Sequence, residues 1–517
     1  MMCDTSADLV LYNARVITMD QKRSEAELVA VKDGKILDVG KGNCLGLFKG
    51  TKARLIDCEG GTVVPGFNDA HCHPLSFAAT LLHVDCSPAS AKNIVEIKEC
   101  IRRKAEQTPE GKWVRAAQYN EVCLEENRHP NRRELDEAAP FHPVILVHYS
   151  GCICVLNSLA LRLVGITMDT PDPEGGHIGR DLETGELDGL VVGRNKLVES
   201  GLPPLDEEEL AQGAKLAFLE YISHGITSLQ DTGWTNGLSQ WQILQRFKEQ
   251  GKLPVRISMM LGSDALEEFR GAGLSTGSGD SRLRVGGVKI ALDESTGCPH
   301  PPQDLLNDHA LRAHQAGFQL ALHVNDVYTL EAALASLEFV QKQTPRPEHR
   351  HRLEHCAVCP PGLMRRLKET GAIVVTQPPF IYCFGDIFLK DVPPAMISWI
   401  FPVGSFHKRG LKIAASSDSP VTPSNPLLGV YAAVTRKTGT GQTISPGEGI
   451  APLEALRMYT YWPAYATFEE NVKGSITPGK LADLVVLSGN PTQVNQEEIK
   501  EIKAMMTIID GKVVWER

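Results

Sequence analysis

The stretch that decides the fold is Pro65-Gly66-Phe67-Asn68-Asp69-Ala70-His71-Cys72-His73-Pro74, in which two histidines stand two residues apart. The apolar run Thr62-Val63-Val64 precedes it. Because side chains alternate across a strand, residues i and i+2 point to the same side. Neutral imidazole is the commonest protein ligand for zinc-like metals. The stretch therefore predicts that His71 and His73 bind one cation at the end of a strand.

Strand-like runs alternate with helical patterns through the middle of the chain, which indicates a parallel α/β architecture. The eight runs are Val63-Val64, Ile226–Gln230, Pro254–Met260, Val285–Leu292, Phe318–His323, Arg352–His355, Ala372–Gln377 and Leu411–Ser416. Eight is the number that a (β/α)8 TIM barrel needs, and such barrels have their active sites at the C-terminal ends of the strands. Most of these runs end on polar or ligand-type residues, so the pattern predicts a barrel with a site at that end.

Short strand-like runs with hairpin turns occupy both ends of the chain. Asp33-Gly34 and Asp510-Gly511 are the turn signals, each flanked by apolar residues. We therefore expect residues 1–64 and 471–517 to form one composite β-sandwich domain, and residues 65–470 to form the barrel.

One spacing is abnormal for a barrel. Roughly 150 residues separate His73 from the second strand, far more than an ordinary crossover needs. We expect an inserted subdomain at about residues 80–210. Because an insertion after the first strand emerges among the βα loops, this subdomain is predicted to cover the barrel mouth and to shape the substrate pocket.

Composition narrows the class of protein. The 517 residues are 42% hydrophobic and 22% charged, which is ordinary for a globular protein. The net charge of −10 and the pI near 5.9 argue against nucleic acid or an anionic membrane as the main partner. The first residues lack the layout of a signal peptide, and thirteen scattered cysteines fit reduced thiols. We expect a cytoplasmic protein.

Further ligand-type residues follow later strands. His323 and His355 each close a predicted strand, and Asp418 follows the apolar run that begins at Leu411. A single histidine in such a place is more often a hydrogen-bonded core residue, but two at consecutive strand ends favour a site. Asp418 has two interpretations, a helix cap or a metal ligand that also accepts a proton. Other histidines with polar neighbours, such as His129, His349 and His407, are expected to be solvated.

Lys289 lies within Val288-Lys289-Ile290-Ala291-Leu292, a strand that is apolar on both faces. A buried ammonium without compensation is costly and tends to lose its charge. A neutral lysine amine can react with carbon dioxide, and the resulting carbamate can bridge two metals. The alternative is a lysine whose head reaches solvent at the barrel end.

These residues bring the chain close to a known family. It resembles the metal-dependent amidohydrolase superfamily, in the branch that contains N-substituted formamide deformylases and D-aminoacylase-like proteins. The resemblance covers nearly the whole chain. The motifs that carry it are Pro65–His73, Arg128-His129-Pro130-Asn131-Arg132, Glu354-His355, Ser417-Asp418-Ser419-Pro420 and Gly474-Ser475-Ile476-Thr477-Pro478-Gly479-Lys480-Leu481-Ala482-Asp483-Leu484.

The resemblance implies a (β/α)8 barrel with a small β-sandwich made from both termini. It implies His71 and His73 on one metal, His323 and His355 on a second, and carboxylated Lys289 as the bridge. The two divalent metals are expected to be zinc, with manganese or iron as alternatives. Asp418 would bind the first metal and act as general base.

The reaction that the resemblance implies is hydrolysis of a non-peptide, amide-type C–N bond through a metal-bridging hydroxide. The expected partner is a small-molecule substrate, with no nucleic acid and no membrane. Self-association as a homodimer is left open.

Two positions depart from the usual pattern of this branch. Cys152 stands where histidine is usual, and Gly193 stands where glutamate is frequent. If these positions contact substrate, two polar groups are missing and the substrate differs from that of better-known relatives. Candidate substrate-binding residues are Cys152, Asp293 and Gln377.

Two other functions compete with this one. A deaminase of the same superfamily with a single metal typically carries His-x-x-Glu at the fifth strand, whereas His323-Val324-Asn325-Asp326 offers aspartate here. Such deaminases also lack a bridging lysine, so Lys289 argues against this alternative. A non-enzymatic relative would keep the barrel as a binding module. Such proteins usually lose metal ligands, and this chain keeps the whole set.

Overall fold

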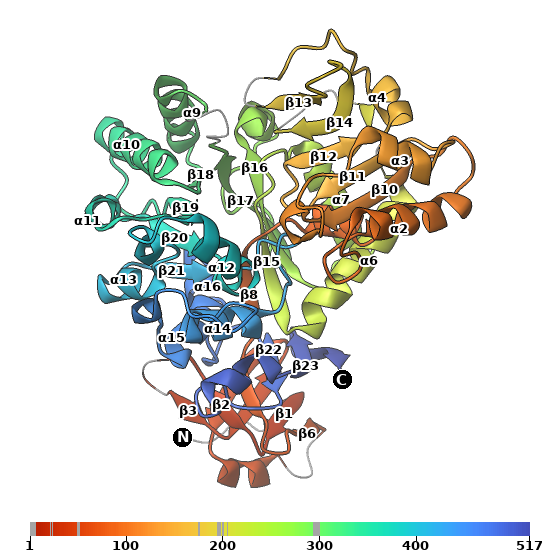
Figure 1. Cartoon of the computed structure of the whole chain (residues 1–517). Coiled ribbons are helices and arrows are strands. Elements are labelled where there is room, and N and C mark those ends of the chain that lie inside the picture. Colours follow the sequence, from red (N-terminus) through yellow and green to blue (C-terminus); the bar gives the residue numbers. More distant parts are fainter. Residues whose placement is uncertain are drawn as a thin grey trace. The chain divides into compact units, whose positions relative to one another are not determined.

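The computed structural model describes residues 7–20, 22, 24–48, 52–173, 176–193, 198, 201–203, 205–292 and 300–517 (Figure 1). The chain divides into two compact units. The first comprises Met1–His73, Phe218–Leu292 and Pro301–Arg517, and the second comprises Pro74–Ala217 and Asp293–His300. Asp293, one of the predicted substrate contacts, lies outside the described residues.

The first unit contains an eight-stranded sheet in the order β21-β20-β19-β18-β17-β16-β15-β8, and every neighbouring pair in it is parallel. Its strands are β8 (Phe67–Cys72), β15 (Ile226–Asp231), β16 (Arg256–Gly262), β17 (Leu283–Ile290), β18 (Leu320–Val324), β19 (Arg352–His355), β20 (Ile373–Thr376) and β21 (Ile413–Ala415). The predicted α/β class with a nearly closed, eight-stranded parallel barrel is confirmed. Seven of the eight predicted runs fall on these strands.

The predicted first strand was wrong. Val63 and Val64 belong to β7 (Thr62–Pro65), which pairs with β2 (Arg15–Ile17) and β22 (Leu484–Leu487) in a different sheet. The barrel begins at β8, immediately after Gly66. A Cβ at Gly66 would lie 2.2 Å from Thr227 Oγ1, so the chain passes too close to β15 there for any other residue. A short apolar run before Pro-Gly cannot reveal which sheet it joins.

Helices follow the barrel strands along the chain. They are α7 (Leu238–Glu249), α8 (Leu266–Gly271), α9 (Gln303–Gln315), α10 (Val327–Gln343), α11 (Pro361–Thr370), α12 (Pro379–Asp391), α13 (Val403–Lys408), α14 (Pro426–Thr435), α15 (Pro452–Met458) and α16 (Tyr461–Ala466). Their ends carry ordinary signals. The Asp326 side chain accepts from Thr329 N at the start of α10, and Gly371 ends α11 in the left-handed region.

Two further sheets of the first unit are built from the ends of the chain. One has the order β5-β4-β1-β6 and the other β24-β23-β22-β7-β2-β3. Their remaining strands are β1 (Leu9–Tyr12), β3 (Glu25–Ala26), β4 (Leu28–Lys32), β5 (Lys35–Gly40), β6 (Arg54–Asp57), β23 (Ala504–Ile509) and β24 (Lys512–Glu516). Val29, Val63 and Ile508 share one core. We propose on this basis that residues 1–64 and 471–517 form a composite β-sandwich domain.

A buried ion pair joins these terminal sheets to the barrel. Arg256, at the start of β16, donates from Nε to Asp483 Oδ2 at 2.6 Å and from Nη2 to Asp483 Oδ1 at 2.9 Å. The same guanidinium also contacts Asp510. Both members of the Arg256–Asp483 pair are buried. Because each charge is compensated at two points, the contact fixes the orientation of the sheet on the barrel.

The second unit contains a six-stranded mixed sheet in the order β13-β14-β12-β11-β10-β9. The strands are β9 (Val84–Asp85), β10 (Val114–Tyr119), β11 (Val144–His148), β12 (Ile153–Leu156), β13 (His177–Arg180) and β14 (Leu187–Val192), with helices α1 (Pro74–Thr80), α2 (Ile94–Glu106), α3 (Arg132–Ala138) and α4 (Ser158–Val164). Helix α6 (Glu207–Ser223) leads from this unit into the first. Ile97, Val114 and Leu146 lie in the core of the second unit. We propose that this sheet is the subdomain expected at about residues 80–210.

No helix within the described ranges is both long enough and apolar enough to cross a membrane.

Candidate metal centre

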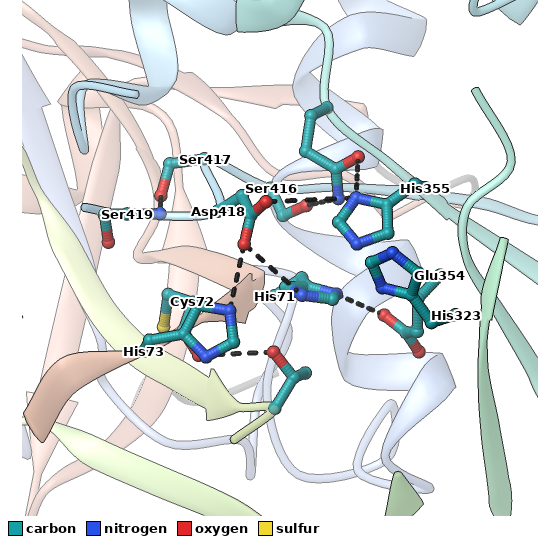
Figure 2. A network of polar contacts seen from close by, with 12 residues as sticks. His71, Cys72, His73, His323, Glu354, His355, Ser416, Ser417, Asp418 and Ser419 are labelled. Carbon is teal, nitrogen blue, oxygen red and sulfur yellow. Dashed lines mark hydrogen bonds and ion pairs between the residues drawn. The ribbon is translucent and has the colours of Figure 1, made fainter. Parts of the chain in front are cut away.

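Two histidines of the first barrel strand reach the same carboxylate oxygen. His71 lies in β8 and His73 just beyond its end. Nε2 of His71 lies 3.4 Å from Asp418 Oδ1, and Nε2 of His73 lies 3.0 Å from the same atom (Figure 2). The His71 ring is buried, whereas the His73 ring is about one quarter exposed. The spacing of two residues therefore brings both rings to one point, as the sequence predicted.

His355 reaches the same point from the end of β19. Its φ of +71° lies in the left-handed region, which few residues other than glycine adopt. A regular strand would turn residue 355 to the face opposite Glu354, away from the barrel interior. The unusual φ coincides with the end of the strand, where the ring contacts His71 instead. Nδ1 of His355 lies 2.9 Å from Gln377 Oε1, and Gln377 Nε2 donates to Ser416 Oγ at 3.0 Å.

Gln377 was predicted as a substrate contact, and its placement differs from that expectation. The side chain is fully buried, and both ends of its amide are used within the protein. In this structure Gln377 orients His355. A polar residue at a strand end predicts a place near the site, but it does not distinguish a substrate contact from a residue that supports a ligand.

Asp418 follows β21 and also adopts a left-handed backbone, with φ of +58°. Its backbone N–H donates to the carbonyl of His71 at 2.8 Å. Burial by itself raises the pKa of the Asp418 carboxyl, but the hydrogen bond from His73 and the nearby charges of His355, His73 and Lys289 outweigh it and hold this pKa below its ordinary value. The carboxylate is therefore ionised and available as a ligand.

The four predicted histidines form a chain of neighbouring rings. Ring centroids are 5.4 Å apart for His73 and His71, 4.6 Å for His71 and His355, and 4.4 Å for His355 and His323. His323 comes from β18, and Asn325 Nδ2 donates to its Nε2 at 2.9 Å. The structure thus brings together all four rings, from three barrel strands.

The electrostatics suit a metal. Burial, followed by the positive charge of Lys289, lowers the pKa of His71 well below its ordinary value. Burial also lowers the pKa of His355 to about 4. Both imidazoles are therefore neutral at pH 7, as metal coordination requires. His71, His355 and Asp418 each offer one donor atom, and these atoms lie within 4.8 Å of one another. This donor set fits a divalent metal.

Lys289 lies near the end of β17 and is only 3% exposed. Its positive charge contributes to the lowered pKa values of His71, His355 and Asp418. The alternative in which the lysine head reaches solvent does not hold. Lys289 is therefore a buried residue at the same end of the barrel strands as the predicted ligands.

Asp69 is a residue of this site that the sequence analysis did not identify. It lies in β8, is buried, and accepts hydrogen bonds from the hydroxyl of Ser417 at 2.5 Å and from the backbone N–H of Ser417 at 3.1 Å. Burial raises the pKa of Asp69 to about 7, although the bonds from Ser417 oppose that shift. Its position two residues before His71 in a strand was the available signal.

Cys152 lies in the second unit, following β11. It is exposed, and its backbone N–H donates to Ser150 Oγ at 3.3 Å. Ser150 Oγ in turn lies 2.7 Å from His148 Nδ1. The carbonyl of Cys152 accepts from Gly193 N at 2.9 Å, so the two positions that depart from the family pattern are neighbours.

Histidines expected to be solvated are in part buried. His129 lies in the second unit with Nδ1 3.0 Å from the hydroxyl of Tyr119, and its ring is one quarter exposed. His349 is 6% exposed and accepts from the backbone N–H of His351 at 2.9 Å. His407 is exposed as expected. The polar sequence neighbours of His349 therefore led to the wrong prediction that it is solvated.

Several known proteins resemble this chain in sequence or in fold. A family model described as "Amidohydrolase family" matches residues 54–515. The N-substituted formamide deformylase of Arthrobacter pascens is 31% identical over 99% of this chain and 98% of its own length. The protein LONG AFTER FAR-RED 3 of Arabidopsis thaliana is 27% identical over 98% of this chain and 92% of its own. A crystal structure of an uncharacterized metal-dependent hydrolase from Pyrococcus horikoshii OT3 has the same fold, with a TM-score of 0.76 at 21% identity over 95% of this chain and 99% of that one.

Proposed function

Because the chain belongs to the amidohydrolase family, we propose that it is a metal-dependent hydrolase that cleaves an amide-type, non-peptide C–N bond in a small molecule. The observation that carries the proposal is the meeting of His71, His355 and Asp418, whose donor atoms lie within 4.8 Å of one another. The three residues come from the ends of three barrel strands, where barrels of this kind have their active sites.

We propose that His71, His73 and Asp418 hold one divalent metal and that His323 and His355 hold a second. Zinc is the first candidate, and manganese and iron are alternatives. A divalent metal in this set would lower the pKa of a water molecule and polarise a carbonyl oxygen. The neutral rings of His71 and His355 and the ionised Asp418 support this assignment.

Lys289 is proposed as the bridge between the two metals. The carbon of carbon dioxide would bond to the neutral Nζ, and one proton would be released, leaving a carbamate with two oxygens. The burial of Lys289 and its electrostatic effect on His71 and His355 support the proposal. A carbamate would replace a buried positive charge with a negative one, which two cations stabilise.

Asp418 is proposed to carry the proton. As water oxygen bonds to the carbonyl carbon and the C–N bond breaks, one water proton passes to the Asp418 carboxylate and then to the departing nitrogen. The products are a carboxylic acid and an amine. Asp418 is suited to this role because it is ionised and held by His73 and by its own backbone N–H on His71.

The substrate class is open to a direct test. The relative called N-substituted formamide deformylase makes N-formyl amines the first compounds to try. N-acyl amines, cyclic amides and carbamates complete the panel, and released amine is measured with zinc-loaded protein. We expect release from at least one class with the wild-type protein and none with His71→Ala/His73→Ala. No release from any class by fully metallated wild-type protein would overturn the proposal.

Cys152 and its neighbour Gly193 are proposed to affect substrate preference, because both depart from the family pattern and lie next to each other. Cys152→His should change the ratio of kcat/KM between two turned-over substrates. Metal content should stay unchanged, since the proposed metal ligands all lie in the first unit. An unchanged ratio would remove Cys152 from the substrate-binding residues.

A further inference from the structure

A buried ion pair lies next to the metal ligands within strand β19. Arg352 and Glu354 are both 0% exposed. Because they stand two residues apart in a strand, their side chains share one face. Arg352 Nε donates to Glu354 Oε1 at 2.6 Å, and Arg352 Nη2 donates to Glu354 Oε2 at 3.0 Å. This two-point contact holds the carboxylate in one orientation.

The same carboxylate contacts His71. Glu354 Oε2 lies 2.6 Å from His71 Nδ1 (Figure 2). A carboxylate that pairs with a guanidinium offers lone pairs alone, so the proton of the neutral imidazole resides on Nδ1 and is donated to Glu354. The lone pair of His71 then lies on Nε2, which is the atom that faces Asp418 at 3.4 Å. Glu354 thus determines which nitrogen of His71 can bind a cation.

Arg352 is itself fixed by two strands across the barrel, β15 and β8, which pair with each other. Its Nη1 donates to Gln230 Oε1 at 2.5 Å in β15, and its Nη2 donates to the carbonyl of Ala70 at 2.7 Å in β8. Gln230 in turn donates to the carbonyl of Pro463 at 2.9 Å. Glu354 therefore cannot move away from His71 without breaking contacts of three strands.

The charge balance explains why both residues are needed. A buried carboxylate without a cationic partner is costly, because it loses its hydration without compensation. Arg352 pairs with Glu354 at 2.6 Å and compensates its charge, so the pair adds no net charge to the site. His71 therefore gains an orienting acceptor while the cation-binding side of the ring is left unchanged.

We propose that the Arg352–Glu354 pair is a positioning device for the metal centre, which fixes the tautomer and the ring orientation of His71 and thereby sets the affinity for the metal. This inference rests on the proposed metal-dependent function. Carboxylate partners of metal-binding histidines are typically worth 10–100-fold in metal affinity. The expected effect is of that size and falls on metal binding rather than on substrate binding.

The test is Glu354→Gln. The amide can either donate to His71 or accept from it, so the tautomer is no longer fixed. We expect the dissociation constant for zinc, measured by competition with a chromophoric chelator, to rise 10–100-fold. KM at saturating zinc should change less than twofold. The visible absorption of the cobalt-loaded protein should also change, since a turned or displaced His71 alters the ligand field.

Glu469→Gln is the matched control. Glu469 is equally buried and pairs with Arg284 at 3.2 Å and with Lys473 at 2.9 Å. Arg284 lies at the start of β17, at the opposite end of the barrel from Lys289. This variant also removes one buried carboxylate from a cationic partner, so it should lower stability while leaving zinc affinity and the cobalt spectrum unchanged.

The outcomes separate this inference from the proposed function. Wild-type protein that binds no divalent metal would contradict the function itself. Wild-type protein that binds zinc, together with Glu354→Gln that binds it equally well, would overturn the positioning role alone. If Glu354→Gln does not fold, Arg352→Met combined with Glu354→Gln leaves no uncompensated buried charge. The same loss of affinity is expected there, and wild-type affinity would again refute the inference.

Discussion

The carboxylate of Asp69 accepts a hydrogen bond from the hydroxyl of Ser417 at 2.5 Å. This bond joins the first barrel strand, β8, to the segment that follows the last barrel strand, β21. Two backbone bonds lie beside it, from Asp418 N to the carbonyl of His71 at 2.8 Å and from His73 N to the carbonyl of Ser419 at 2.9 Å. We call this contact between β8 and the segment after β21 the seam. The proposed base Asp418 lies on one side of it, and the proposed metal ligands His71 and His73 lie on the other. The geometry of the site depends on this seam.

Ser417→Ala tests the seam. The substitution leaves the buried Asp69 side chain without this partner, which costs about 1–3 kcal/mol of stability. A loosened Asp418 should lower kcat more than it raises KM. Ser405→Ala is the matched control, because the Ser405 hydroxyl and backbone N–H both donate to Glu448 at 2.6 Å, at the start of α13. The Ser405→Ala variant should be less stable than the wild type but should have an unchanged kcat. Equal kcat values in the two variants would show that the Asp69–Ser417 contact has only a structural role.

Metal stoichiometry tests the proposed pair of metals. His71, His73, His323, His355, Asp418 and Lys289 supply more ligands than one four-coordinate ion needs. Protein purified without chelators and then supplied with zinc or manganese should reach two metals per chain by elemental analysis. A content that stays at one would favour the deaminase-like arrangement with a single metal.

Lys289→Ala should remove the bridge. We expect the second metal to be lost and most of the activity with it, because a buried apolar side chain offers no ligand. A short carboxylic acid supplied with bicarbonate should restore part of the activity by occupying the space of the carbamate. Mass spectrometry of the wild-type protein under native conditions should detect the added carbon dioxide. An unmodified amine at Lys289 in a metal-loaded crystal structure would contradict the carbamate.

Asp418→Asn should separate proton transfer from metal binding. The amide keeps the shape and one weak oxygen ligand but cannot accept the proton. General acid–base groups are typically worth about 10²–10⁴ in rate, so kcat should fall at least that far. Metal content should fall much less, because His71 and His73 remain. Rate and metal content are measured on one preparation, and a fully metallated variant with near-normal kcat would mean that another group moves the proton.

A cluster of three histidines predicts acid sensitivity of the fold. Leu320 N donates to His351 Nδ1 at 3.0 Å, His351 Nε2 lies 2.9 Å from His314 Nδ1, and His351 N donates to His349 Nδ1. Burial lowers the pKa of all three, and that of His351 falls well below its ordinary value, helped by His349 and the guanidinium of Arg346. All three are therefore neutral in the folded protein.

The sign of the pH effect follows from this difference. In the unfolded chain these histidines titrate near pH 6.5. Below that pH the unfolded state therefore binds more protons than the folded state. Stability should fall as the pH drops from about 6.5 toward the lowered native pKa values, by up to about 1.4 kcal/mol per pH unit for each histidine. Urea unfolding at pH 7.5 and 5.5 measures it. His351→Gln keeps one acceptor and one donor and should show a smaller pH effect, whereas the exposed His407→Gln should match the wild type.

The barrel could be predicted because most of its apolar strand-like runs end on polar or ligand-type residues. His323 and Asp418 each follow an apolar run, His355 closes the run Arg352–His355, and a parallel barrel brings such ends together. The same reasoning failed at Val63-Val64, because two apolar residues carry no information about the sheet they join. It also assigned Gln377 to substrate binding, whereas both ends of its amide are used within the protein, because a strand-end residue can face a substrate or support a ligand.

Side-chain contacts across the barrel could not be predicted from local sequence patterns. Glu354 meets His71, and Arg352 meets Gln230, between residues far apart in the chain. Side-chain alternation predicts that Arg352 and Glu354 share a face, but it does not reveal what lies opposite. His349 is similar, because its burial comes from His351 and the carbonyl of Thr370 rather than from an apolar neighbourhood in sequence.

The sheet β24-β23-β22-β7-β2-β3 has a consequence for how the protein is made. Val64 pairs with Val485, and β23 and β24 complete the same sheet, so strands synthesised before the barrel have partners synthesised after it. While the ribosome is still translating the barrel, one edge of β7 is left without the neighbour that will cover it. Unpaired strand edges of this kind promote aggregation, and contacts of such long range slow folding. This sheet can therefore close only when β22, β23 and β24 have emerged, and not when the barrel emerges.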